Sequence, residues 1–392
     1  MTHRVEDTTI AHVMETLITH GLDEMAEVFQ LLMNEAMKLE RSKFLQAEPF
    51  ERSKGRRGYA NGYKDKTVRS RLGNIELRIP QVRDTTDGEG FYPQALERGL
   101  RSERALALAV AEMYVQGVST RRVKEVTREL CGLEVSSTDV SRAAAMLDEQ
   151  LESWRTRPLE QVPYLVLDAR YEKVRHGGQV VSCAVLVATG VLADGRRSVL
   201  GVSVALSEAE VHWREFLSSL AERGLHGVKL VVSDAHEGLK KALAAVLPSV
   251  PWQRCQFHLQ QNAGHYVPRV SMRKEVADAI RAIFNAPDRA EAERLLGKMC
   301  DQYRESAPRL ATWAEENIPE GLTVFQIPAS HRRRLRTTNG LERLNKEIKR
   351  RTRVATLFPN EAALLRLVTA IVSEVSEEWE AATRAYINME AE

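Results

Sequence analysis

The chain has 392 residues, 43% of them hydrophobic, which is enough for two or three domains with packed cores. No apolar run approaches a membrane-spanning length and the opening MTHRVEDTT lacks a signal core, so we expect a cytoplasmic protein without a membrane partner. Four widely separated cysteines exclude a disulfide framework and a four-cysteine zinc site. The net charge of +2 alone argues weakly against nucleic-acid binding, but the charges are unevenly distributed.

The N-terminal part carries apolar side chains at helical spacing over residues 10–45, with Gly21 as the expected break. This pattern predicts one or two amphipathic helices. Their apolar face suits either core packing or a contact between two copies of the chain, and the sequence does not decide between the two.

A basic stretch follows at residues 51–71, where Tyr59 and Tyr63 are interleaved with Arg and Lys. Such a stretch favours phosphate contact, and the DNA-binding residues that we expect here are Arg56, Arg57 and Lys64. It overlaps VRSRLGNIELRIPQVRD, which predicts a hairpin with a Gly73-Asn74 turn and a second strand closed by Pro80.

Two short helices are predicted in VSTRRVKEVTRELCG and EVSSTDVSRAAAMLDEQL, each opened by Ser or Thr caps and joined at Cys131-Gly132. This is the outline of a helix-turn-helix. Its second helix would present four side chains to a major groove: Ser137, Thr138, Ser141 and Arg142. A plain helical hairpin is the commoner alternative.

Two apolar runs further along the chain each lead to an aspartate: VPYLVLDARYEK reaches Asp168 and VKLVVSDAHEGL reaches Asp234. Each predicts a buried strand with its aspartate at or near the C-terminal end, where α/β sheets tend to place ligand groups. Either aspartate alone is better interpreted as a turn residue. The pair, with a glutamate downstream, favours catalysis.

The segments around these runs predict a β-β-β-α-β-α-β order that begins near Pro163. The other strands are expected at 179–189, 197–206 and 252–255, and the helices at 208–223 and 237–245. Residues 260–320 are helical in pattern without a strand run, which indicates a helical insertion before the end of the core.

The most informative stretch is TTNGLERLNKEIKRRTR, with one carboxylate, Glu342, near the start of a predicted helix rich in Lys and Arg. From His331 to Arg353 ten cations stand against two acids, and this nearly uniform sign favours phosphate contact over a solvated helix face. The DNA-binding residues that we expect here are Arg333, Arg336, Asn339, Arg343, Lys346 and Arg350. The buried stripe of the helix is expected at Leu341, Leu344 and Ile348.

Three carboxylates in one site repel one another unless divalent cations neutralise them, and Mg²⁺ prefers hard oxygen ligands. Asp168, Asp234 and Glu342 therefore suggest cleavage or transfer of phosphodiesters by two metals. Glu342 also has a structural alternative, because it stands three residues after Asn339 with the spacing of a helix capping box.

Several pieces of the sequence resemble the mutator-type transposases of bacterial insertion sequences, a family with an RNase H-like core and an Asp-Asp-Glu triad. They run in the family's order from GRRGYANGYKDK to the FPN at 358–360 and include VLDARYEKVR, HWREFLSSLAERGL, VVSDAHEGL, WQRCQFHLQQN and RTTNGLERLNKEIKRRTRV. The resemblance implies that Asp168, Asp234 and Glu342 are the catalytic residues and metal ligands, with Mg²⁺ as cofactor and Mn²⁺ as a substitute. It also implies an all-helical insertion domain and terminal inverted repeats as the recognised DNA.

Cys255 and His258 form a Cys-x-x-His pair after a predicted strand. Two ligands do not close a tetrahedral zinc site, so we do not expect zinc. The family carries this pair at the same place, which assigns both residues to the active-site neighbourhood in a structural or substrate-orienting role. His236, two residues after Asp234, either contacts phosphate or is solvated, and Trp213 is expected in the core.

The predicted fold is therefore α/β, with an RNase H-like core of five mixed strands and flanking helices, an all-helical insertion, and a mainly helical N-terminal DNA-binding region. The predicted parts are an N-terminal region at 1–100, a helix-turn-helix-like region at 101–156, the first part of the core at 157–260, the insertion at 261–330 and the completion of the core at 331–392.

The predicted function is transposition of an insertion sequence by two-metal phosphoryl transfer, comprising 3′-end cleavage and strand transfer. The partners are double-stranded DNA, as inverted repeats and target, and a second copy of the chain in a homodimer, in the bacterial cytoplasm at the nucleoid. One alternative is a metal-dependent nuclease of the same fold that cuts but does not join. The other is a DNA-binding regulator with structural carboxylates, whose binding would survive metal removal.

Overall fold

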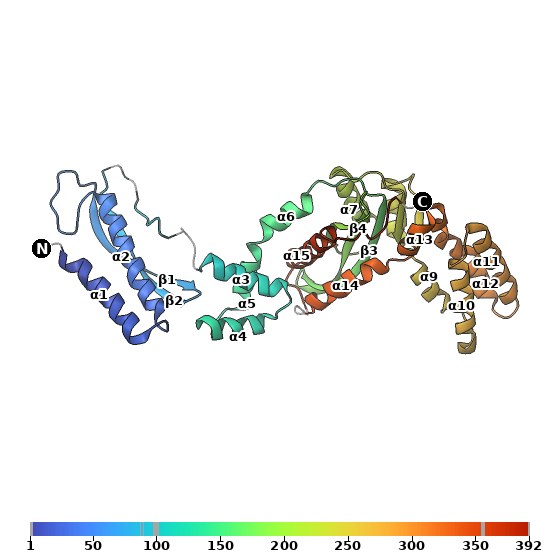
Figure 1. Cartoon of the computed structure of the whole chain (residues 1–392), viewed down its shortest axis with the longest axis horizontal. Helices are drawn as coiled ribbons and strands as arrows, with labels where there is room; N and C mark the ends of the chain where they lie inside the picture. Colours follow the sequence, from blue (N-terminus) through green and yellow to red (C-terminus); the bar gives the residue numbers. More distant parts are fainter. Residues whose placement is uncertain (1–2, 87, 89, 97–101, 354–356, 391–392) are drawn as a thin grey trace. The chain divides into compact units, whose positions relative to one another are not determined.

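The computed structural model describes residues 3–86, 88, 90–96, 102–353 and 357–390 (Figure 1). The chain forms two compact units, Met1–Tyr114 with Val118–Met146, and Val115–Gly117 with Leu147–Glu392. No helix in the described part of the chain combines the length and apolar character needed to cross a membrane.

The first unit begins with the two predicted amphipathic helices, α1 (His3–His20) and α2 (Met25–Leu45), which are separated at Gly21 as expected. Helix α2 packs against a two-stranded antiparallel sheet of β1 (Tyr59–Ser70) and β2 (Gly73–Arg83). Met37 of α2 is buried against Ile75 and Leu77 of β2, so part of the apolar face does pack in a core.

The hairpin differs from its prediction in three respects. The turn is at Arg71-Leu72, Gly73 and Asn74 already belong to β2, and β2 continues past Pro80. The Ser70 hydroxyl accepts a hydrogen bond from the Leu72 N–H (3.1 Å) and donates one to the Gly73 carbonyl (3.1 Å), which holds the turn two residues earlier than predicted. The basic stretch from Tyr59 onward is therefore strand β1.

The two predicted helices of the helix-turn-helix outline are present as α4 (Thr120–Cys131) and α5 (Ser137–Ala145), after α3 (Arg104–Val115). Ser119 caps α4, and Gly132, with φ of 64°, ends it. Ser136 and Asp139 form a capping box at the start of α5. The local helix signals are confirmed, while a DNA-reading role stays a prediction.

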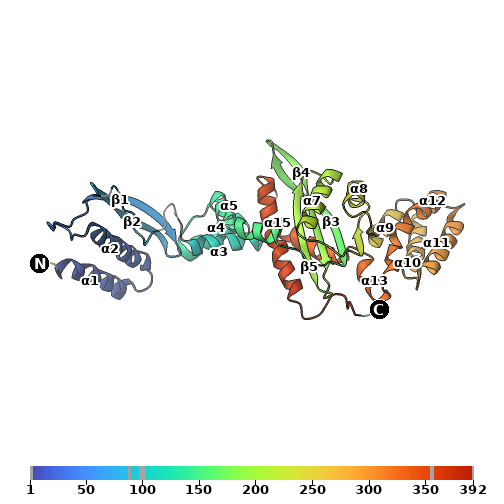
Figure 2. The same cartoon turned by 90° about the horizontal axis from the view of Figure 1, so that it is seen from above.

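The second unit contains a mixed five-stranded sheet, of which β3, β4 and β5 are labelled in Figure 2. The order of the strands is β5-β4-β3-β6-β7. The first three strands are antiparallel neighbours, whereas β6 is parallel to β3 and β7 is parallel to β6. The strands are β3 (Tyr164–His176), β4 (Gln179–Val191), β5 (Arg197–Ala205), β6 (Leu230–Ser233) and β7 (Trp252–Arg254). With α7 (Glu210–Glu222) and α8 (Glu237–Val246) between them, they confirm the predicted β-β-β-α-β-α-β order.

The sheet has a hydrophobic core on each face because successive side chains of a strand point to opposite sides. Leu165 and Leu167 pack in one core with Trp213, which is fully buried as expected. Tyr164 and, in part, Val166 pack in the other, beside α13 (Ala329–Leu335).

The predicted helical insertion lies between β7 and α13 and has its own core, in which α10, α11 and α12 pack together. Its elements are α9 (Gln256–Ala263), η1 (Val270–Met272), α10 (Arg273–Phe284), α11 (Arg289–Tyr303), α12 (Pro308–Asn317), η2 (Ile318–Gly321) and η3 (Thr323–Gln326).

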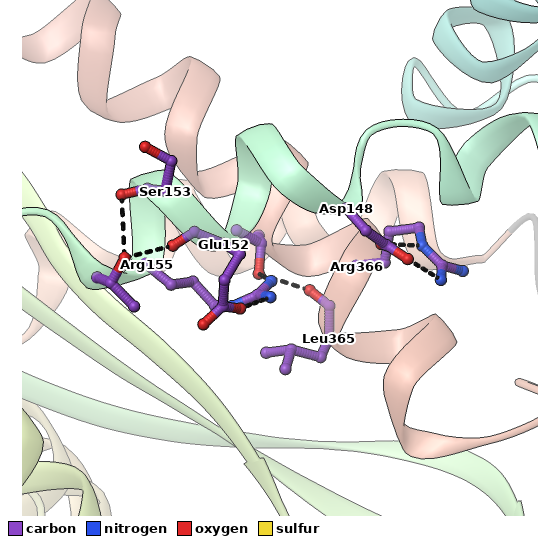
Figure 3. A network of polar contacts seen from close by, with 8 residues as sticks. Asp148, Glu152, Ser153, Arg155, Leu365 and Arg366 are labelled. Carbon is purple, nitrogen blue, oxygen red and sulfur yellow. Dashed lines mark hydrogen bonds and ion pairs between the residues drawn. The ribbon is translucent and has the colours of Figure 1, made fainter.

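Helix α15 (Glu361–Glu380) packs against β5 and holds α6 (Asp148–Thr156) through polar contacts (Figure 3). The Asp148 carboxylate accepts hydrogen bonds from Arg366 at 2.5 and 2.7 Å, and Arg155 donates to the buried Thr369 hydroxyl at 3.1 Å. Helix α6 therefore belongs to the second unit, whereas the sequence analysis grouped it with residues 101–156.

Helix α14 (Asn339–Thr352) is fixed to α15 by Arg351, whose side chain is 6% exposed. The guanidinium donates to Glu347 at 2.7 Å and to both oxygens of Glu374 at 2.5 and 3.0 Å. The predicted stripe of α14 is buried, with Leu341, Leu344 and Ile348 at most 1% exposed.

We expect Arg351→Ala to lower the free energy of unfolding by about 2 kcal/mol, because it leaves two partly buried carboxylates without their shared cation. Urea unfolding followed by circular dichroism measures this. The control is Lys349→Ala on the exposed side of the same helix, with an expected change within about 0.5 kcal/mol. Equal losses in the two variants would contradict the role given to Arg351.

Candidate active site

The pairing of β3 with β6 brings Asp168 and Asp234 to the same level of the sheet. The last paired residues are Val166 and Val232, and each aspartate lies two positions further on. Asp234 directly follows β6, as predicted, but Asp168 is inside β3, which continues to His176 alongside β4. The prediction of a strand end at Asp168 is thus wrong for β3, although it describes where the pairing with β6 stops.

The two aspartates line a cavity of about 280 Å³. Other polar side chains on its wall are Glu208, His236, Arg254, His258 and Asn262. His236 contacts Glu208 at 3.9 Å, and Arg254 is paired with Glu320 at 2.9 Å. The cavity thus gathers both predicted aspartates and both predicted histidines.

Asp168 is held by two hydrogen bonds. Its Oδ1 accepts from the Ala169 N–H at 2.9 Å, and its Oδ2 accepts from the Asn345 side chain of α14 at 2.6 Å. Burial, and next the charge of Asp234, raise the pKa of Asp168 to about 6 despite these bonds. Burial and the neighbouring carboxylate therefore both disfavour the ionised form of Asp168.

Asp234 is in contact with His258, the second member of the Cys-x-x-His pair. Hydrogen bonds to Asp234 and then to Cys255 raise the pKa of His258 to about 10, so the ring is an imidazolium near neutral pH. Asp234, Cys255 and His258 place a carboxylate oxygen, a sulfur and a ring nitrogen within 4.8 Å of one another. Only Cys255 and His258 are close enough in the sequence to be recognised as a pair of potential ligands, because Asp234 is distant in the chain.

Cys255 also fixes the start of α14. Burial alone would raise its thiol pKa, but hydrogen bonds with His258 and Thr338 outweigh that and lower it. The Thr338 N–H donates to Cys255 Sγ at 3.4 Å, and the Thr338 hydroxyl lies 3.4 Å from the same sulfur. The Gln256 N–H also donates to the Arg336 carbonyl at 2.9 Å, so this junction joins β7 to the segment leading into α14.

Glu342 is on α14, one turn before Asn345, and its side chain is 42% exposed. It does not line the 280 Å³ cavity. The capping-box alternative does not match the helix either, because α14 already includes Asn339, and Thr338 at the cap makes no side-chain cap hydrogen bond. Glu342 instead faces Lys346 at 3.9 Å.

Comparison with known proteins decides the family. The sequence model described as "Transposase, Mutator family" matches residues 1–382. The chain belongs to this family.

Three relatives illustrate the match. The chain is 58% identical to the transposase for insertion sequence element IS406 of Burkholderia multivorans over 97% of each chain. It is 42% identical to the transposase for ISRM5 of Rhizobium meliloti, over 99% of this chain and 96% of the relative. It is 33% identical to the transposase for IS256 in transposon Tn4001 of Staphylococcus aureus over 99% of each. The function is therefore that of a transposase of insertion sequence elements.

Sequence reasoning missed four polar residues at the site of this transposase: Asn345, Glu208, Arg254 and Asn262. Asn345 stands three positions after Glu342 in NGLERLN, so helical spacing alone could have put both on one face. Glu208 lies two residues before α7 and has no local signal, because only the tertiary fold brings it to the aspartates.

The predicted DNA-binding residues are distributed over both units. In the first unit, Lys64 is exposed on β1, and Arg56 and Arg57 stack on the rings of Tyr59 and Phe44. Arg142 on α5 is 76% exposed. In the second unit, Arg333, Arg343 and Lys346 are exposed. Arg336 donates to Asn285 at 2.6 Å, and Arg350 pairs with Glu347. Asn339 is the first residue of α14.

We expect Cys255→Ala to lower the free energy of unfolding by about 1–2 kcal/mol, because it removes the acceptor of a buried N–H at Thr338. Cys255→Ser keeps an acceptor and should lose less. Thermal and urea unfolding of both variants measures the difference. A serine variant less stable than the alanine variant would contradict an anchoring role for the sulfur.

Proposed function

We propose that this transposase cleaves and joins DNA strands at Asp168, Asp234 and Glu342, which bind divalent cations. The observation that carries the proposal is that Asp168 on β3 and Asp234, directly after the parallel strand β6, lie at the same level and line one cavity. The strand order, with three antiparallel strands followed by two parallel ones, supports an RNase H-like core.

Helix α14, which carries Glu342, runs along β3. Asn345 contacts Asp168 through its side chain, and its carbonyl accepts from Arg170 at 2.5 Å. Further along both elements, Thr352 donates to Glu172 at 3.0 Å. Glu342 lies about 4.5 Å before Asn345 along the helix axis and on the same face, which supports a place beside Asp168.

The donor set fits divalent cations. Burial, and next the charge of Asp234, raise the pKa of Asp168 to about 6, and a bound cation would favour its ionised form. Carboxylate oxygens suit Mg²⁺, with Mn²⁺ as a substitute. When bound, such ions supply activation of the attacking oxygen and stabilisation of the leaving oxygen in an in-line displacement.

The remaining residues of the site orient these ligands. Asn345 donates to Asp168 and leaves its carboxylate free to accept further contacts, while the His258 imidazolium holds Asp234. Cys255 keeps α14, and with it Glu342, beside the sheet through Thr338. These contacts hold the carboxylates in the arrangement that the reaction needs. The proposed reaction requires no covalent protein intermediate.

The proposed DNA partners are terminal inverted repeats and target DNA, held by the cations of the two units. Three exposed cations lie close in sequence to Glu342, which suits contact with phosphates near the scissile bond: Arg333, Arg343 and Lys346.

We further propose a homodimer on DNA, acting in the bacterial cytoplasm. Ile10, Met14 and Ile18 support it, since they form a stripe along α1 that is 59%, 55% and 84% exposed.

The test is a strand-transfer assay on supercoiled plasmid with the element's own ends and Mg²⁺. Asp168→Asn, Asp234→Asn and Glu342→Gln should each abolish joining, because each replaces a charged metal ligand by a neutral amide of the same shape. The controls, Asp301→Asn and Glu315→Gln, make the same changes at exposed sites on the insertion and should join like wild type.

The other outcomes separate the alternatives. Metal-dependent nicking without joining by the wild type would indicate a nuclease, and DNA binding without strand breaks would indicate a regulator. Joining by Glu342→Gln at the wild-type rate would mean that the third ligand lies elsewhere.

A further inference from the structure

A second cavity, of about 750 Å³, lies in the insertion beside the active site. We call it the insertion pocket and define it by Arg254, Asn262, His265, Tyr266, Arg309 and Trp313. Its walls come from β7, α9, the segment after α9, and α12.

The insertion pocket adjoins the site of the aspartates. Arg254 and Asn262 line both this pocket and the 280 Å³ cavity of Asp168 and Asp234. Arg254 is largely buried and is held by Asn317 and Glu320, both at 2.9 Å, so this shared wall is rigid. A polymer with a phosphate at the aspartates can therefore extend into the pocket.

The pocket has an aromatic wall. The rings of Tyr266 and Trp313 stack with centroids 5.3 Å apart and an interplanar angle of 21°. Trp313 is 6% exposed within the hydrophobic core of the insertion, and Tyr266 is partly buried against that core. A flat ring anchored in this way offers a stacking surface to a nucleobase at little entropic cost.

The polar side chains of the pocket are available for a ligand. In the part of the chain that the structure describes, no hydrogen bond or ion pair engages the side chains of Arg309, His265 or Asn262. Elsewhere on the insertion some exposed arginines are paired, as Arg289 is with Glu293 and Arg294 with Glu291, whereas Arg269 and Arg273 resemble Arg309 in having no such partner among the described residues. Glu316 adds one carboxylate, which can accept from a base amino or imino group.

We propose that the insertion pocket binds an unpaired nucleotide of the DNA strand that continues from the scissile phosphate, with its base against Tyr266 and its phosphate near Arg309. A volume of about 750 Å³ is in the range of sites for small ligands, and the combination of stacking ring and cation is typical of single-strand binding. The inference rests on the proposed function, because it takes the aspartates as the place of the reacting phosphate.

The experiment compares binding of a blunt DNA duplex with that of the same duplex carrying a short unpaired overhang, at either the 3′ or the 5′ end. Fluorescence anisotropy is recorded with the full-length protein in EDTA, so the result does not depend on catalysis. The wild type should bind one overhang duplex more tightly than the blunt one. Arg309→Ala and Tyr266→Leu should each reduce this preference about fivefold or more and leave the blunt duplex unaffected.

The matched control is Arg281→Ala, which removes an exposed arginine of the same insertion outside the pocket and should keep the wild-type preference. Melting curves identify a variant that fails to fold. If Tyr266→Leu fails to fold, Arg309→Ala still tests the proposal, because Arg309 is exposed. Equal binding of blunt and overhang duplexes by the wild type, or equal losses on both duplexes in Arg309→Ala, would overturn the proposal.

Free nucleotide is the remaining rival. Three results together would overturn the proposal in favour of a mononucleotide site. Added ATP would remove the overhang preference and leave binding of the blunt duplex unchanged. Arg309→Ala would abolish direct binding of ATP, and the same variant would keep its affinity for the overhang duplex. An intact overhang preference in a protein that fails the strand-transfer assay would count against the catalytic proposal and not against the pocket.

Discussion

The repulsion between two neighbouring carboxylates is the constraint around which the second unit is arranged. The β3–β6 register brings Asp168 and Asp234 together, and burial together with the charge of Asp234 holds the pKa of Asp168 near 6. Contact with the His258 imidazolium offsets part of the charge on Asp234. A divalent cation bound between the two aspartates would offset this unfavourable environment, which is the basis of the metal-dependent chemistry that we propose.

The helical insertion separates the aspartates from Glu342 by a long stretch of sequence without separating β3 from α14 in space. Three contacts hold α14 in place: Cys255 with Thr338 at its start, Asn345 with Asp168 in its middle, and Arg351 with Glu374 on its far side. The insertion can therefore form its own core and pocket while α14 stays fixed to the sheet.

The elements of the core were predictable from the sequence because runs of Val and Leu and helical spacing are local signals. The errors arose where a local signal was ambiguous. Nothing in VLDARYEK marks that β3 continues past Asp168, since pairing with β4 sustains it. Ser70 moves the hairpin turn ahead of Gly73. The contacts of Asp168 with Asn345 and of Asp234 with His258 depend on the tertiary fold, so only the family resemblance hinted at the second of them.

The central claim is that Asp168, Asp234 and Glu342 together bind the catalytic cations, and anomalous diffraction from crystals of the protein soaked in Mn²⁺ tests it most directly. Our account predicts Mn²⁺ in contact with the carboxylates of both aspartates and of Glu342. A single ion held by Asp234, Cys255 and His258, with Glu342 remote from it, would contradict the account, because those three groups form the competing ligand set in the described part of the chain.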